Sequence, residues 1–253
     1  MRRTLLTGSL ALLALGAAVA PAFASTPALD KLTLAAKTTA CTTGEQETSR
    51  AATFTGSMPA VAGTRRMQMR FVLVQRLGET GPFARVEVPG WGSWEKSDPG
   101  RPGFVFTKRV AALAAPASYR AQITFRWVDR KGHALRTTTR TTSTCVQPDP
   151  RPDLVLGGLD IAPKGADQAV YTLAVDDDGR AAAGAFTVTI AVDGVLQPPL
   201  TLGPLAAGER GHGTIVGARC SAGSTITVTV DSGDAVDESA EDDDTVQRPC
   251  LIG

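Results

Sequence analysis

The sequence predicts an all-β protein with two β-sandwiches in tandem, and three observations support this. Segments of alternating apolar and polar residues, rich in β-branched types, recur along the chain. Residues 25–150 hold 18 Lys and Arg against 9 Asp and Glu, a balance of +9, whereas residues 151–253 hold 6 against 16, a balance of −10. Between the halves, alternate prolines in Gln147–Pro152 favour a short, stiff linker. We therefore expect one domain over residues 38–147, a linker over 148–152 and a second domain over 153–253.

The N-terminus has the features of a cleaved Sec-type signal peptide. Arg2 and Arg3 precede an apolar run over residues 10–19, and Ala22 and Ala24 supply a small-x-small cleavage site. The apolar run is shorter than the roughly twenty residues that span a membrane. We expect a signal peptide over residues 1–24, a flexible segment over 25–37, and a secreted, extracellular protein with no membrane span.

Four strands stand out in the positively charged half. Residues 67–73 and 119–127 alternate between inward apolar and outward polar types, and residues 104–110 and 135–145 are further expected strands. Asp129–Gly132 is a hairpin turn, because Gly132 is free to adopt positive φ. Short strands with regular turns are typical of an immunoglobulin-like or fibronectin-III-like sandwich.

The negatively charged half ends in an expected hairpin. Every residue of Thr225–Val230 is β-branched, and alternation places Ile226, Val228 and Val230 on one face. An acidic loop over residues 231–244 follows, and a return strand ends at Cys250. This hairpin closes the second expected sandwich.

Four cysteines in an exported chain predict two disulfides. Of the three pairings, Cys41–Cys145 with Cys220–Cys250 keeps each bridge inside one expected domain. Metal binding is the weaker interpretation, because no close pair of cysteines or cluster of cysteine and histidine exists in the sequence.

The C-terminal half resembles the CARDB family, bacterial cell-adhesion-related domains with an immunoglobulin-like sandwich fold. The pattern V-D-x-x-x-x-V-x-E-S-x-E-x-D-D over residues 230–244 is similar to the family's last hairpin. Four earlier segments also resemble family strands and turns: residues 153–155, 169–179, 186–194 and 205–209. The sequence departs from the family at Asp178, Asp243 and Asp244, where asparagine is frequent, so this loop is more acidic. The resemblance implies a role in adhesion.

The acidic loop is the strongest candidate site. Carboxylates are the hard oxygen ligands that calcium prefers. The candidate ligands are Asp231, Asp234, Asp237, Glu238, Glu241 and Asp242. The loop lacks the ligand order of an EF-hand, so a solvated tip or a surface for a basic partner stays an alternative. A second acidic segment, residues 176–179, is interpreted as a turn with Gly179 in the left-handed region.

Two further groups are candidate binding surfaces. Trp91 and Trp94 lie in a glycine-rich segment, where they either stack on a sugar or a partner side chain, or fold back over the sandwich edge. Basic side chains at alternate positions of two expected strands project from one sheet face and would bind polyanions, unless they only keep that face solvated. These are Arg120, Arg126, Arg136 and Arg140.

No catalytic residues are expected. The two histidines, His133 and His212, fall in different expected domains, and no nucleophile motif is present. The expected function is non-catalytic binding or adhesion at the bacterial cell envelope, toward an extracellular protein or an envelope glycan, without nucleic acid and without a cofactor other than calcium. The alternatives are a structural spacer without a ligand site, or a hydrolase with carboxylates at the domain junction.

Overall fold

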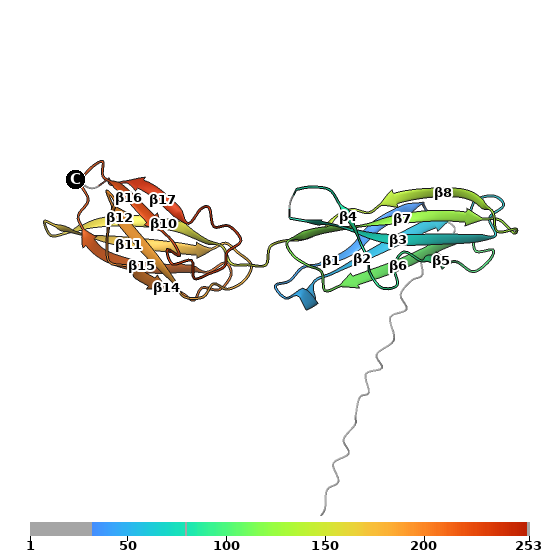
Figure 1. Cartoon of the computed structure of the whole chain (residues 1–253), viewed down its shortest axis with the longest axis horizontal. Coiled ribbons are helices and arrows are strands. Elements are labelled where there is room, and N and C mark those ends of the chain that lie inside the picture. Colours follow the sequence, from blue (N-terminus) through green and yellow to red (C-terminus); the bar gives the residue numbers. More distant parts are fainter. Residues whose placement is uncertain (1–31, 79, 252–253) are drawn as a thin grey trace, which may run out of the picture.

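The structure is a computed structural model that describes residues 32–78 and 80–251. The expected signal peptide over residues 1–24, and residues 25–31 of the expected flexible segment, lie outside the described residues. Nearly all secondary structure is antiparallel β-strand, with one 3₁₀ turn at Glu47–Ser49 (Figure 1). No helix among the described residues is long and apolar enough to cross a membrane.

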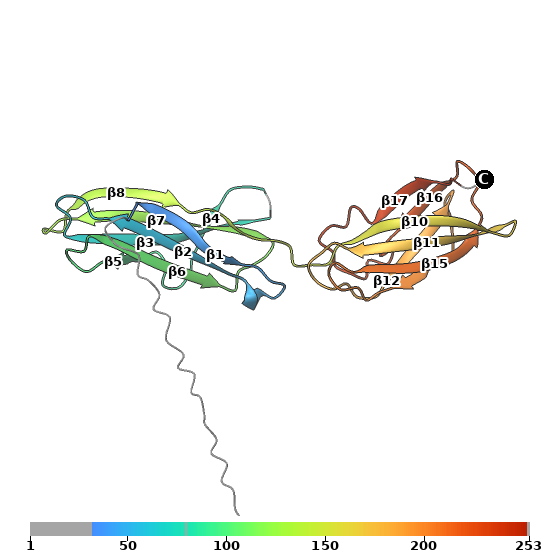
Figure 2. The same cartoon turned by 180° about the vertical axis from the view of Figure 1, so that it is seen from behind.

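The N-terminal half forms a sandwich of two sheets, visible from both sides in Figures 1 and 2. A three-stranded sheet has the order β1-β2-β6, and a six-stranded sheet has the order β4-β3-β7-β8, with β5 on β3 and β9 on β7. The strands are β1 (Ala35–Thr42), β2 (Ala51–Pro59), β3 (Arg66–Leu77), β4 (Ala84–Val86), β5 (Trp94–Lys96), β6 (Gly103–Ala111), β7 (Ala117–Val128), β8 (Ala134–Thr141) and β9 (Cys145–Gln147).

The alternation seen in the sequence produces the core of this sandwich. In β7, Ile123, Phe125 and Trp127 point inward and are buried, and they pack on Phe54 of β2 and Met69 of β3. The buried indole of Trp127 donates a hydrogen bond to the carbonyl oxygen of Pro59 at 2.7 Å, so its polar atom is satisfied. Period-two patterning is therefore sufficient to define the inner face of the sheet.

The C-terminal half forms a second sandwich with its own core. Its sheets have the orders β10-β11-β15 and β13-β12-β16-β17, with β14 on β12. The strands are β10 (Leu154–Lys164), β11 (Gln168–Asp177), β12 (Phe186–Val192), β13 (Val195–Leu196), β14 (Leu200–Leu202), β15 (Arg210–Ala218), β16 (Thr225–Thr229) and β17 (Thr245–Pro249). As expected, Ile226, Val228 and Val230 face the core, where they meet Tyr171 and Phe186.

Each sandwich has one disulfide, with the expected pairing. Cys41 of β1 pairs with Cys145 of β9, and Cys220 after β15 pairs with Cys250 after β17. Each bridge joins the two sheets of its own sandwich. The described part of the chain has no free cysteine.

Two predicted boundaries in the N-terminal half are wrong. The expected strand over residues 135–145 ends at Thr141, because the Thr142 hydroxyl accepts the backbone N–H of Ala121 at 3.1 Å in place of a ladder carbonyl. The chain resumes pairing with β7 only at Cys145. The expected flexible segment also extends too far, because β1 begins at Ala35, where pairing with Ser57 of β2 starts.

The turn at residues 176–179 differs from the prediction in the role of its glycine. Gly179 does not have a positive φ. A Cβ atom there would lie 2.4 Å from the carbonyl carbon of Pro152 and 2.5 Å from the amide nitrogen of Asp153. Asp177 is fully buried, and its Oδ1 accepts the N–H groups of Asp153 and Gly179 at 3.2 and 3.0 Å. Close approach to the linker, rather than a left-handed conformation, is what requires glycine.

We expect Gly179→Ala to lower the free energy of unfolding of the C-terminal sandwich by about 1–3 kcal/mol, because backbone atoms cannot move aside as a flexible side chain can. Gly184→Ala is the matched control, since a Cβ atom there meets nothing within 4 Å. Urea unfolding separates the two sandwiches: circular dichroism reports both, whereas tryptophan fluorescence reports only the N-terminal one, which contains Trp91, Trp94 and Trp127. An equal loss in both variants would contradict this role of Gly179.

Candidate functional site

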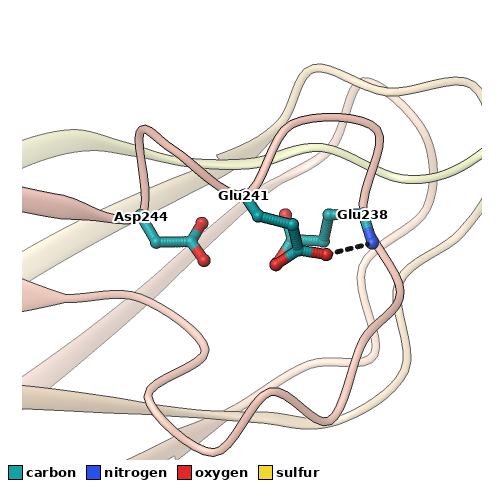
Figure 3. Close-up of side chains that lie close together, drawn as sticks. All are labelled: Glu238, Glu241 and Asp244. Carbon is teal, nitrogen blue, oxygen red and sulfur yellow. Dashed lines mark hydrogen bonds between the residues drawn. The ribbon is translucent and has the colours of Figure 1, made fainter.

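Three carboxylates converge in the loop between β16 and β17. One oxygen each of Glu238, Glu241 and Asp244 lies within 4.8 Å of the other two, and Figure 3 shows the side chains pointing toward one another. Glu238 is buried, Asp244 is partly buried and Glu241 is exposed. The cluster therefore extends from the interior of the sandwich to solvent.

Backbone hydrogen bonds bring Glu238 inside. Its Oε2 accepts the N–H of Leu154, the first residue of β10, and its own N–H donates to Glu241 Oε1 at 2.9 Å (Figure 3). The next residue, Ser239, donates its N–H to the carbonyl oxygen of Pro152 at 2.8 Å. Glu238 is only 1% exposed, and its Oε1 has no hydrogen-bond partner among the described residues.

A second buried carboxylate, Asp231, lies at the start of the same loop. Its Oδ2 accepts the N–H groups of Ala235 and Val236 at 2.8 and 2.7 Å, which holds the turn after β16. The residue is 5% exposed, and its Oδ1 has no donor in the described part of the chain. The same is true of Asp244 Oδ1.

The cluster has an uncompensated negative charge. Burial, with further effects from neighbouring carboxylates, raises the pKa of Glu238 to about 7. Burial and then the charges of Glu241 and Asp243 raise the pKa of Asp244 to about 6. None of the ion pairs between described residues includes Asp231, Glu238, Glu241 or Asp244. A proton or a cation can supply the missing positive charge.

The cluster differs from the ligand set predicted from the sequence. Asp234 and Asp242 are exposed and lie outside it, and Asp237 instead pairs with Arg151 at 2.6 Å. Asp244, which was not among the predicted ligands, belongs to it. The sequence feature that identifies this cluster is the three-residue spacing of the acidic residues at positions 238, 241 and 244. The total number of acidic residues in the loop does not identify it.

The predicted basic surface also differs. Register with β7 places Arg136 opposite Trp127 and Arg140 opposite Ile123. Both arginines therefore project from the same side of the sheet as the core residues, but at exposed positions. Arg120 and Arg126 project from the outer face. The prediction that all four share one face is wrong, because a bulge at Leu135 of β8, between the pairs Val128–Ala134 and Trp127–Arg136, shifts the register by one residue.

The outer face of β3 and β7 is instead an alternation of arginines and aromatic rings. The guanidinium groups of Arg126 and Arg70 lie 3.9 and 5.0 Å from the ring centroid of Trp94. Those of Arg120 and Arg76 lie 4.3 and 5.2 Å from the ring centroid of Phe83. Phe83 and the two β3 arginines were missed, because only the three-dimensional register brings them beside Arg120 and Arg126. We call these four arginines and two rings the arginine–aromatic face.

The two tryptophans of the glycine-rich segment have different environments. Trp91 packs edge-on against Phe54 and Phe71, at centroid distances of 6.1 and 6.2 Å, and belongs to the margin of the core. Gly92, with φ of +80°, turns the chain outward, and its N–H donates to Phe71 at 2.9 Å. Trp94 then joins the arginine–aromatic face as the first residue of β5.

With divalent cations chelated, the free energy of unfolding of the C-terminal sandwich should fall as pH rises from about 5 to 8. The folded-state pKa values of Glu238 and Asp244, about 7 and about 6, exceed the ordinary values of 4.5 and 3.8. The folded chain therefore holds protons that the unfolded chain has released, and this stabilisation is lost as pH rises through the folded values. The carboxyls with lowered pKa, such as Asp149 and Asp176, titrate below this window.

Urea unfolding at several pH values measures the slope. Glu238→Gln should flatten it and raise stability at pH 8, whereas Asp242→Asn, outside the cluster, should leave it unchanged. The same slope in Glu238→Gln as in the native chain would show that the cluster does not hold these protons.

Several solved structures share distant similarity with this chain. A domain of a "putative cell surface protein" from Methanosarcina acetivorans is 24% identical with a TM-score of 0.32, over 38% of this chain and 88% of that chain. Red sea bream transglutaminase is 9% identical with a TM-score of 0.31, and the match covers 87% of this chain and 31% of the enzyme. The chicken CNTN1 FN1–FN3 domains are 10% identical with a TM-score of 0.24, over 82% and 64% of the two chains.

The family comparison is specific to one half. No curated protein matches the chain. The CARDB family model matches residues 151–248, which include β10 to β16, the acidic loop and most of β17. This agrees with the resemblance seen in the sequence and with the observed sandwich of antiparallel sheets. The segment 151–248 is therefore similar to CARDB domains.

Proposed function

We propose that this protein is a non-catalytic, secreted binding protein of the bacterial cell envelope, and that its arginine–aromatic face binds an anionic envelope glycan. The family match supports an adhesion-type role for the C-terminal sandwich. Two disulfides fit an extracellular location, where such bonds persist. The separate cores of the two sandwiches support independent domains on either side of residues 148–152.

The composition of the outer sheet face is the observation on which the ligand class rests. Cross-strand register places basic side chains of four strands on this one face: Arg66, Arg70, Arg76, Arg85, Lys96, Arg120 and Arg126. The other outward positions of β3, β5 and β7 are Gln, Thr, Ser, Val and Trp, with no carboxylate. Beside β4, Arg85 pairs with Glu87 at 2.8 Å. A flat surface with this charge attracts a polyanion.

The aromatic rings give this face more than charge. A planar guanidinium held against a ring loses less conformational entropy on binding than a free side chain does. The Nε atoms of Arg70 and Arg126 are buried beside Trp94, which restricts both side chains. Arginine forms paired hydrogen bonds with carboxylate or phosphate, the anionic groups of acidic polymers. Restricted arginines therefore favour specific recognition over diffuse attraction.

The experiment uses immobilised polygalacturonate as an anionic probe and dextran as a neutral one. We expect the full chain to bind polygalacturonate only, with an affinity that falls as salt rises. Arg120→Gln/Arg126→Gln should weaken binding roughly tenfold, the effect of losing about one charged hydrogen bond.

Arg136→Gln/Arg140→Gln is the matched control, because it removes the same charge from the opposite side of the sheet. Equal weakening in both variants would mean diffuse electrostatic attraction and would contradict the proposed site. If neither probe binds, the structural-spacer alternative is favoured.

A catalytic role has less support. His133 lies 3.6 Å from Asp129 in the β7–β8 hairpin, whereas His212 belongs to β15 in the other sandwich, so the two histidines are not parts of one site. The clustered carboxylates are in the β16–β17 loop and are held by backbone N–H groups. We therefore favour binding over hydrolysis at the domain junction.

A further inference from the structure

The acidic loop over residues 231–244 contains buried carboxylate oxygens that have no hydrogen-bond donor among the described residues. Glu238 is almost completely removed from solvent, yet its Oε1 has no hydrogen-bond donor, and Asp231 Oδ1 and Asp244 Oδ1 are also buried without one. Several buried carboxylates that share one site cannot all stay ionised without a compensating charge. The three unpaired oxygens belong to one loop of fourteen residues, positions 231–244.

We propose that Glu238, Glu241 and Asp244 form a calcium site that closes the β16–β17 hairpin. Two ligands of one calcium ion, each about 2.3–2.6 Å from the metal, lie at most about 5 Å apart. The oxygens of Glu238, Glu241 and Asp244 lie within 4.8 Å of one another, which meets this condition.

The ligand chemistry selects calcium over other metals. The donors are carboxylate oxygens, with no histidine or cysteine in the cluster, so zinc is disfavoured. Magnesium requires near-ideal octahedral geometry, whereas calcium accepts six to eight oxygens in irregular arrangements completed by water. Because Glu241 is exposed and Glu238 is buried, the proposed site is open to solvent on the Glu241 side.

Calcium would also stabilise the junction between linker and sandwich. Glu238 Oε2 accepts the N–H of Leu154, Ser239 donates to Pro152, and Asp237 pairs with Arg151. These three contacts tie the loop to the chain segment that enters β10. An ion on the free oxygens would fix the loop in this position, so metal binding and stability of the C-terminal sandwich would be linked.

The test is calorimetric titration of CaCl₂ into the full chain after treatment with a chelator. We expect one saturable site, with a Kd of about 0.1–1 mM, the range of extracellular modules, and weaker binding of MgCl₂. Glu241→Gln and Asp244→Asn should each weaken calcium binding by at least about tenfold, because affinity follows the number of charged ligands. In Glu241→Gln the new amide oxygen can still accept the N–H of Glu238, so the loop should keep its fold.

Asp234→Asn and Asp242→Asn are matched controls, since each removes one charge from the same loop at an exposed position outside the cluster. Both should bind calcium as the native chain does. No heat from CaCl₂, together with an unchanged melting temperature, would overturn the proposal and identify protons as the compensating charge. Equal losses in cluster and control variants would overturn it too, since they would indicate diffuse screening. Polygalacturonate binding uses the other sandwich, so its failure is distinguishable from failure of the calcium site.

Discussion

The hydrogen bonds that hold the chain segment entering β10 determine which carboxylates of the C-terminal sandwich are buried. The N–H groups of Asp153 and Leu154 lie at the first turn of the chain into the core, where they need acceptors. Carboxylates supply them: Asp177 accepts from Asp153, and Glu238 accepts from Leu154. Both carboxylates are therefore buried, at 0% and 1% exposure, and each retains one oxygen without a donor. These two acidic residues accept backbone hydrogen bonds that the fold requires. Their remaining oxygens leave buried negative charge, which a bound cation would compensate.

This constraint explains why two carboxylates of the acidic half, Asp177 and Glu238, are buried beside the linker. The loop after β16 must reach back to the linker, and charged acceptors make stronger hydrogen bonds to backbone N–H groups than neutral ones. Gly179 allows the second loop to approach the same segment, because any side chain there would overlap with Pro152. Two loops distant in sequence thus meet at one short stretch of backbone.

Alternation in the sequence predicted the inner faces of β3, β7 and β16 correctly, since period two fixes which side chains are buried. It could not predict which outward side chains become neighbours. Arg136 and Arg140 look equivalent to Arg120 and Arg126 in sequence, but a bulge at Leu135 of β8 puts the two pairs on opposite sides of the sheet. In the same way, the number of acids in the loop did not identify Asp244, because its place in the cluster depends on Glu238, which is held by Leu154 far away in the chain. Strand register and long-range hydrogen bonds therefore determine which side chains form the two candidate sites, and neither can be read from the local sequence pattern.

The two charged regions should respond differently to the extracellular medium. The arginine–aromatic face is solvent-facing, so its attraction to an anionic polymer is screened by added salt. The carboxylate cluster is partly enclosed, and its charge is compensated by a specific ion or proton rather than by the ionic atmosphere. Calcium in the medium would therefore stabilise the C-terminal sandwich at concentrations that hardly screen the basic face. Calcium would hold the C-terminal sandwich rigid beside the linker, while the N-terminal sandwich stays available to an acidic surface. The opposite charges of the two halves allow both interactions in the same medium.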